Sequence, residues 1–273
     1  MLLQEVEYAR PETIDEAVRL LASRENARAL AGGQSLVNVM KVRVASPDLV
    51  VDLDRISELK EVRVAPDRSL ELGAMVTYAE LIESEDVLAA RPILAEVAIT
   101  IADVQVRNRG TIGGNICSND PTNHFPPVLA SLGATMTIRA LEAERTVSVD
   151  DFFEGVFMTA VSPGELLTRI TISARQPGQG DGWASTTVGK DGTGIVNVAA
   201  TVRDGNARIA LGCVSAVPVV LAATADEVAV RDAVRSADLD PPSDVHASAD
   251  YRRHLAVVLS ARAVTQALEM ARA

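Results

Sequence analysis

Cysteine is scarce in this sequence. Only two of the 273 residues are cysteines, Cys117 and Cys213, and they are not in CxxC spacing. A disulfide framework, a structural zinc site and an iron–sulfur cluster each need more cysteines, or closer ones. We therefore expect none of the three in this chain, and the scarcity of cysteine favours a reducing, cytoplasmic location.

Basic residues are also few. The 26 Lys and Arg side chains are outnumbered by 37 Asp and Glu side chains, which gives a net charge of −11 and a pI near 4.8. Because nucleic-acid backbones attract basic surfaces, this balance argues against a nucleic-acid-binding protein.

Long hydrophobic runs are absent. The most apolar stretch, Val214 to Ala223, is about ten residues long and contains Pro218, whereas a membrane-spanning helix needs roughly 20. The N-terminal segment lacks an apolar core preceded by positive charge, which a secretory signal would have. The sequence thus predicts neither a membrane span nor a cleaved leader.

Motifs for metal binding or side-chain catalysis are lacking too. The three histidines, His124, His246 and His254, follow no HExxH or other metal-ligand spacing, so a surface or capping role is expected for them. No set of nucleophile, base and orienting acid can be read from the spacing. Any redox chemistry would therefore belong to a cofactor.

What is present is an ordinary globular composition, 48% hydrophobic and 23% charged, with a length that suits two domains or three small ones. Periodicity and turn residues predict an α+β fold without internal repeats.

Helices are predicted over 11–23, 35–40, 92–102 and 250–272, with capping boxes at Thr13/Glu16, Thr77/Glu80 and Thr224/Glu227. Strands are predicted at 27–31, 49–53, 62–64, 70–72, 135–139, 146–149, 166–172, 195–203 and 207–217. The segment 103–127 is predicted to be a long loop, and 176–194, which contains six glycines, a flexible connection or lid.

Two double-glycine loops are the main chemical signal. They are AGGQSL at 31–36 and GTIGGN at 110–115. Successive glycine amides can point together at an anion, and a helix that begins after the turn adds partial positive charge. Each loop could hold one phosphate and the pair a pyrophosphate, although either loop alone could equally be a tight turn. Neither matches GxGxxG or GxxxxGK[ST], which disfavours a Rossmann fold and a P-loop kinase.

Several motifs together resemble one flavoprotein family. They are AGGQSL at 31–36, IADVQVRNRGTIGGN at 101–115, NDP at 119–121, GELL at 164–167 and HASADYRRHL at 246–255. In order and spacing they resemble the FAD-binding medium subunit of molybdenum hydroxylases, the carbon-monoxide dehydrogenase and xanthine dehydrogenase group. The resemblance implies a vanillyl-alcohol-oxidase (PCMH)-type fold with two small α/β subdomains, at 1–60 and 61–170, and a C-terminal α+β domain at 171–273.

The resemblance also implies which residues bind FAD. They are Ala29, Leu30, Ala31, Gly32, Gly33, Gln34, Ser35, Leu36, Ile101, Ala102, Thr111, Ile112, Gly113, Gly114, Asn115, Leu167 and Lys190. Leu167 matches a position that lines the flavin ring, although its residue type suits a protein core equally well. Lys190 matches a lysine that reaches the cofactor, and its charge suits a phosphate or the flavin N1–C2 edge.

Some positions differ from the family pattern. His124 replaces an aspartate that accepts hydrogen bonds from the sugar hydroxyls. If its imidazole takes over that role, we expect it to bind the cofactor and to titrate near a pH of about 6.5. The alternative is a loop residue, with the sugar held by Asn115, Asn123 or water. The segment from Lys190 to Ile195 is short, and Ile195 takes the place of an aromatic residue that some relatives put over the flavin ring.

Other residues near the loops also bear on cofactor binding. Gln34 stands where enzymes of this fold with covalent flavin often carry histidine, which implies noncovalent FAD. Arg107 and Arg109 are candidates to attract phosphate, with solvated loop charges as the alternative.

The implied function is electron transfer within a heteromeric molybdenum hydroxylase. FAD would receive electrons from iron–sulfur clusters and pass them to an external acceptor. A [2Fe–2S] cluster ordinarily needs four ligands, so the clusters are expected on a small [2Fe–2S] subunit and the molybdenum cofactor on a large molybdenum subunit. A free-standing FAD-dependent oxidase or monooxygenase for a small molecule, and a non-redox binding module, remain alternatives.

Overall fold

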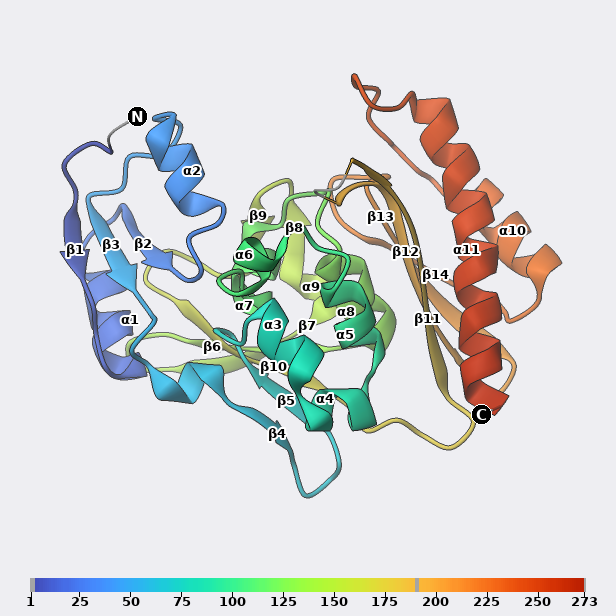
Figure 1. Cartoon of the computed structure of the whole chain (residues 1–273), viewed down its shortest axis with the longest axis horizontal. Coiled ribbons are helices and arrows are strands. Elements are labelled where there is room, and N and C mark those ends of the chain that lie inside the picture. The colour runs from blue at the N-terminus through green and yellow to red at the C-terminus, as the bar shows by residue number, and fades with distance from the viewer. Residues whose placement is uncertain (1–2, 190–191, 273) are drawn as a thin grey trace.

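The N-terminal region forms a parallel three-stranded sheet with the order β1-β3-β2. The computed structural model describes residues 3–189 and 192–272. The region contains β1 (Glu7–Ala9), α1 (Ile14–Ala22), β2 (Ala27–Leu30), α2 (Leu36–Lys41) and β3 (Leu49–Asp52). The central strand β3, of sequence LVVD, is buried along its whole length, as parallel strands usually are. Helix α1 lies against the sheet (Figure 1), and its Ala17, Val18 and Leu21 side chains belong to the core beneath it.

Two of the predicted capping boxes start helices, but only one is complete. At α1, Thr13 Oγ1 accepts a hydrogen bond from the Glu16 amide at 3.2 Å, whereas the Glu16 carboxylate accepts from the amide of Glu12 instead of Thr13. At α3 (Tyr78–Glu83), both reciprocal bonds between Thr77 and Glu80 form. These caps satisfy amides that a helix start leaves free.

The middle region is built on an antiparallel five-stranded sheet with the order β4-β5-β10-β6-β7. The strands are β4 (Val62–Val64), β5 (Leu70–Gly73), β6 (Thr135–Arg139), β7 (Glu144–Ser148) and β10 (Leu166–Ile172), and a 3-10 helix, η1 (Ser57–Lys60), precedes them. The helices are α3, α4 (Glu85–Ala90), α5 (Ile93–Ala98), α6 (Val104–Arg107), α7 (Ile112–Ser118), α8 (Phe125–Leu132) and α9 (Val149–Phe152), and a small hairpin pairs β8 (Phe153–Gly155) with β9 (Met158–Thr159). The main hydrophobic core lies between this sheet and its helices.

The predicted loop over 103–127 is wrong, because most of it is helical. Helix α6 is capped by the Asp103 carboxylate and α7 by the Thr111 hydroxyl, and α8 begins at Phe125. These helices have four to eight residues. Such short helices do not display a clear 3.6-residue period, whereas their caps are local signals.

The C-terminal region is a four-stranded antiparallel sheet covered by two helices. It contains β11 (Gly180–Val188), β12 (Thr193–Arg203), β13 (Asn206–Gly212), β14 (Val219–Thr224), α10 (Glu227–Ser236) and α11 (Ala249–Arg272). Figure 1 shows α11, in red, running along one face of the sheet, while α8 packs against β12 and β13. The mixed helix and sheet content confirms the predicted α+β class. Within the described ranges, no helix has both the length and the hydrophobicity to cross a lipid bilayer.

The predicted flexible lid over 176–194 is wrong for its central part, which is the regular strand β11. A Cβ atom at Gly180 would lie 2.0 Å from the carbonyl oxygen of Ala267, and one at Gly182 would lie 2.1 Å from that of Ala263. These glycines therefore allow α11 to approach the strand closely rather than making the segment flexible.

The predicted cap of α10 is also wrong. Its N-cap is Asp226, whose carboxylate accepts from the amide of Ala229 at 3.0 Å, and not Thr224. An aspartate at this position adds a negative charge beside the positive end of the helix dipole, which favours it over threonine.

A buried ion pair connects the middle and C-terminal regions. Arg91, which ends α4, donates to Asp181 of β11 at 2.9 Å and to the carbonyl of Ser173 at 2.7 Å. The other carboxylate oxygen of Asp181 accepts from Thr201. Both charged side chains are at most 2% exposed. The pair thus fixes how β11 is placed against the helices of the middle region.

Candidate functional site

The two glycine loops contact each other directly, although they are far apart in the sequence. A Cβ atom at Gly32 would lie 1.8 Å from the carbonyl oxygen of Arg109, and one at Gly114 would lie 3.3 Å from the Ala31 Cβ. Only glycine at position 32 permits this close backbone approach. The fold therefore builds one composite surface from both loops.

The first loop has free backbone donors. Gly33 adopts the left-handed conformation with φ of 75°, and Ser35 precedes α2 without a side-chain capping bond. The Gln34 side chain donates to the carbonyl of Gly32 at 3.0 Å, which braces the turn. Within the part of the chain that the structure describes, the amides of residues 33–35 donate no hydrogen bond. They are available to an anion such as a phosphate.

In the second loop the amides of 112–115 donate within the fold, and of this described loop only the buried Thr111 amide donates no hydrogen bond, so the loop offers an anion fewer backbone donors than the first. The amides of Ile112 and Gly113 donate to the carbonyls of Val76 and Ala74, and those of Gly114 and Asn115 donate to Thr111. This happens because TIGGN is the start of α7, so Thr111 caps the helix. Its glycines instead permit close packing: a Cβ atom at Gly110 would lie 2.6 Å from the Tyr78 ring, and one at Gly113 would lie 2.4 Å from the Ala74 carbonyl oxygen.

Asn115 is the side chain of the second loop that can bind a ligand. Its amide nitrogen donates to the Tyr78 hydroxyl at 3.0 Å, and its backbone carbonyl accepts from Asn123. Its Oδ1 atom is buried and has no partner among the described residues. Because a buried acceptor without a partner is costly, this oxygen suits a hydroxyl or amine of a bound molecule.

The segment before α6 is held in an unusual conformation. Ala102 has φ of 45°, a left-handed conformation that costs a residue with a Cβ roughly 1–2 kcal/mol. The Arg107 guanidinium donates from Nη1 to the carbonyl of Ile101 at 3.0 Å and to that of Ala102 at 2.8 Å. Arg107 thus binds two backbone carbonyls through Nη1, and its attraction of phosphate stays a prediction. Arg109 is exposed and stays a candidate for that role.

Leu167 and Ile195 are buried rather than placed beside an open ring site. Leu167 is 2% exposed and belongs to the main core, which favours its assignment as a core residue. Ile195, which takes the place of an aromatic residue in some relatives, is 8% exposed and packs in the C-terminal core. Every second side chain of a β-strand faces the same side, so apolar side chains on the side that faces a core are buried.

His124 is enclosed at the junction between the middle and C-terminal regions. It is 3% exposed at the start of α8, and its ring centroid lies 5.5 Å from that of Trp183 on β11. Burial lowers the pKa of His124 to about 4, so the expected titration near a pH of about 6.5 is wrong. Its Nε2 atom is buried without a partner among the described residues. The imidazole of His124 is therefore neutral at physiological pH.

The comparisons with known proteins agree on one family. The family described as "FAD binding domain in molybdopterin dehydrogenase" matches residues 4–174, which is more than half of the chain. The carbon monoxide dehydrogenase medium chain of Afipia carboxidovorans is 38% identical, with 96% of each chain covered. The glyceraldehyde dehydrogenase medium chain of Sulfolobus acidocaldarius is 34% identical, with 95% of this chain and 97% of that one covered.

Solved structures extend the agreement to the whole fold. A chain of the reconstituted CO dehydrogenase from Oligotropha carboxidovorans superposes with a TM-score of 0.93 at 35% identity, over 99% of this chain and 100% of that one. The protein belongs to the FAD-binding medium-chain family of molybdopterin dehydrogenases. It is therefore an FAD-binding subunit of an oxidoreductase.

The residues of this medium chain fit FAD at the glycine loops. Free amides at 33–35 suit the diphosphate, and the unpaired Oδ1 of Asn115 suits a polar group of the cofactor. Ile101 and Leu36 are half-buried and leave apolar surface beside the loops. Lys190, which the resemblance also placed at the cofactor, lies outside the described residues.

Two residues hold the site of the medium chain together, and of these the sequence indicated only Asn123, as an alternative partner of the sugar. Tyr78 supports Asn115 through its hydroxyl and stacks on Phe125, with ring centroids 5.6 Å apart. Asn123 donates to the Asn115 carbonyl at 2.9 Å and to Ser118 at 3.0 Å. Neither stands in a glycine motif, and the only available signal for Tyr78 was its position directly after the Thr77 cap.

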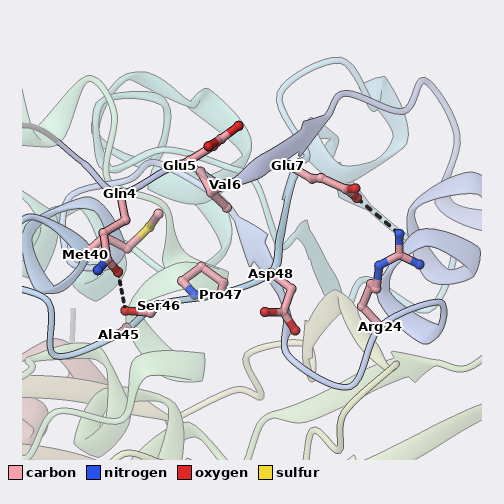
Figure 2. A pocket seen from close by; sticks show the side chains of 10 residues that line it. All are labelled: Gln4, Glu5, Val6, Glu7, Arg24, Met40, Ala45, Ser46, Pro47 and Asp48. Atoms are coloured by element: carbon pink, nitrogen blue, oxygen red, sulfur yellow. Dashed lines mark hydrogen bonds and ion pairs between the residues drawn. The ribbon is translucent and has the colours of Figure 1, made fainter.

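A cavity outside this site is drawn in Figure 2. It has a volume of about 550 Å³ beside β1 and is lined by Gln4–Glu7, Arg24, Met40 and Ala45–Asp48. The Glu7 and Arg24 side chains face each other at 3.3 Å, and Ser46 donates to Gln4. None of the predicted FAD-binding residues lines it. We assign it no role in flavin binding.

Proposed function

We propose that this medium chain is the electron-transfer subunit of a heteromeric molybdenum hydroxylase. When bound, FAD would supply the redox link between [2Fe–2S] clusters on a small partner subunit, which a molybdenum centre on a large subunit would serve, and an external acceptor. The observation that carries the proposal is the direct contact between the two glycine loops, with free amides at 33–35.

The chain's own groups bind and orient in this proposal, and none is assigned a covalent step. The amides of 33–35 stabilise the negative charge of the diphosphate. Asn115 offers an acceptor to the cofactor, while Tyr78 and Asn123 keep its side chain and carbonyl in place. His124, which lies at the start of α8 against Trp183, stays neutral and moves no proton at physiological pH.

The direct test is flavin binding by the purified full chain. We expect one FAD per chain, released on acid precipitation, because Gln34 offers no group for covalent attachment. Gly32→Ala should remove the flavin absorbance, because its Cβ would clash with the Arg109 carbonyl at 1.8 Å and push the loops apart. The matched control is Gly155→Ala, whose Cβ would make ordinary contacts of 3.7 Å and 3.8 Å with Met158.

Two results would contradict the proposal. One is a Gly32→Ala variant with full flavin content, which would mean that contact between the loops is not needed. The other is turnover of a small organic substrate by the chain alone, which would favour the free-standing oxidase or monooxygenase. Yellow colour that stays with the polypeptide after acid precipitation would overturn the noncovalent attachment only.

A further inference from the structure

The backbone from Thr100 to Ala102 is a strained segment with two separate supports. Ala102 has φ of 45°, which few residues other than glycine adopt. Strained backbone of this kind persists only where the surroundings enforce it. The segment joins the end of α5 to α6 and includes Ile101, which the family resemblance places at the flavin.

The first support is the guanidinium of Arg107. Its Nη1 atom donates to the carbonyl of Ile101 at 3.0 Å and to the carbonyl of Ala102 at 2.8 Å, the two carbonyls on either side of the strained residue's α-carbon. Arg107 lies on α6, whose start is fixed by the Asp103 carboxylate that accepts from Val106 at 2.9 Å. Because the donor is charged, these bonds are stronger than neutral ones.

The second support comes from the C-terminal region. A Cβ atom at Gly192, in the turn before β12, would lie 2.5 Å from the Thr100 carbonyl oxygen and 3.5 Å from the Ala102 amide nitrogen. Gly192 therefore lies directly against the strained segment. Because Gly192 itself has φ of 69°, a larger residue there would be disfavoured by both conformation and space.

We propose that Arg107 is a positioning residue for the flavin: it holds the peptide of Ile101 and Ala102 in the conformation that the bound cofactor requires. The inference rests on the proposed function, since it assumes that FAD binds beside this segment. It differs from phosphate attraction, because it assigns Nη1 a role in holding two backbone carbonyls. The phosphate is left to the amides of 33–35.

The two roles predict different coupling between Arg107 and Ala102. With glycine at position 102 the left-handed conformation carries no Cβ penalty, so the hydrogen bonds from the Arg107 guanidinium contribute less to keeping the backbone in that conformation. A positioning role therefore predicts that Ala102→Gly partly rescues Arg107→Met. A phosphate-binding role predicts that the two substitutions act independently, and that the Arg107→Met defect vanishes at high salt.

The experiment measures the FAD dissociation constant of the full chain by flavin fluorescence, together with the visible absorption band of the bound flavin. Arg107→Met should weaken FAD binding about tenfold and shift the shape of the absorption band. Arg107→Lys should weaken FAD binding about threefold. Arg107→Met in the Ala102→Gly background should also weaken it about threefold. Arg145→Met is the control, because Arg145 also donates to a backbone carbonyl, that of Ala160, away from the loops. Its FAD affinity should stay within twofold.

The possible failures are distinguishable. Binding by Arg107→Met within twofold of the wild type, or an equal loss in the Ala102→Gly background, would overturn the inference and leave the proposed function intact. A wild-type chain that binds no FAD would overturn both. If Arg107→Met does not fold, Arg107→Lys alone decides the question, with unchanged affinity and band shape counting against the inference.

Discussion

At the residue scale, burial decides the chemistry of His124 more than its position in the sequence does. The residue type and the family pattern predict a contact with the cofactor that titrates near neutral pH. In the fold, the ring is enclosed by Trp183 and by the start of α8. Removal of water disfavours the charged imidazolium, and this lowers the pKa of His124 to about 4.

This lowered pKa predicts how stability depends on pH. Between roughly pH 4 and pH 6.5 the unfolded chain protonates this imidazole and the folded chain does not, so stability should rise with pH across that window and be lost as the pH falls through it. The difference of about 2.5 pKa units corresponds to about 3 kcal/mol. We expect urea unfolding midpoints to fall from pH 7 to pH 4.5.

A variant separates His124 from the other titrating groups. His124→Asn should have a smaller difference in unfolding free energy between pH 7 and pH 4.5 than the wild type, while His254→Asn, which changes an exposed histidine on α11, should keep the wild-type difference. An identical pH dependence in wild type and His124→Asn would show that the imidazole is not buried in its neutral form.

At the element scale, the sequence predicts the elements whose signals are local, but it misses β1 and β14. The α11 helix, the β12–β13 hairpin and the β4–β5 hairpin follow from periodicity and turn residues. The glycines of β11 are misread as flexible because their role depends on α11, which packs against them from about eighty residues away. The segment 103–127 is misread because its helices are shorter than the pattern that identifies them.

The candidate site is predictable to a similar extent. AGGQSL and TIGGN identify the two loops, but the sequence does not reveal that the amides of 112–115 in the second loop are bonded inside the fold. It also cannot separate Arg107, which binds two backbone carbonyls, from Arg109, which is exposed. Such differences come from tertiary contacts, and these cannot be read from the type of an individual residue.

The buried ion pair between Arg91 and Asp181 supports a prediction about the junction of the two regions. Arg91→Met should destabilise the chain by about 3–5 kcal/mol, because it leaves the buried Asp181 carboxylate without its charged partner. Arg139→Met is the control: its ion pair with Asp15 is partly exposed and should be worth about 1 kcal/mol or less. Urea unfolding of both variants measures the difference.

A double variant tests whether the effect comes from the unpaired charge. Arg91→Met combined with Asp181→Leu removes both charges and should recover part of the loss, since an apolar pair avoids the cost of burying a lone carboxylate. If Arg91→Met is no more destabilising than Arg139→Met, the junction is held by the hydrophobic core that spans it and not by the ion pair.

At the scale of the whole molecule, the chain is a flavin-binding unit with few means to hold any other redox centre. Its two cysteines lie apart, and burial raises the pKa of both Cys117 and Cys213 to about 12. A thiol with such a pKa stays protonated at neutral pH, whereas the thiolate is the form that binds metal. Within the described residues, no group of three or more His, Cys, Asp and Glu side chains could hold a metal ion.

We therefore expect iron and molybdenum to be found with partner subunits and not with this chain. Co-expression with neighbouring genes that encode a cysteine-rich small protein and a large hydroxylase subunit should give a complex that contains both metals, while the chain purified alone contains neither. The double variant Cys117→Ser/Cys213→Ser should leave the iron content of the complex unchanged, because neither thiol is a ligand. Stoichiometric iron in the isolated chain, or loss of iron from the complex with the double variant, would place a cluster here and contradict the division of redox centres among subunits.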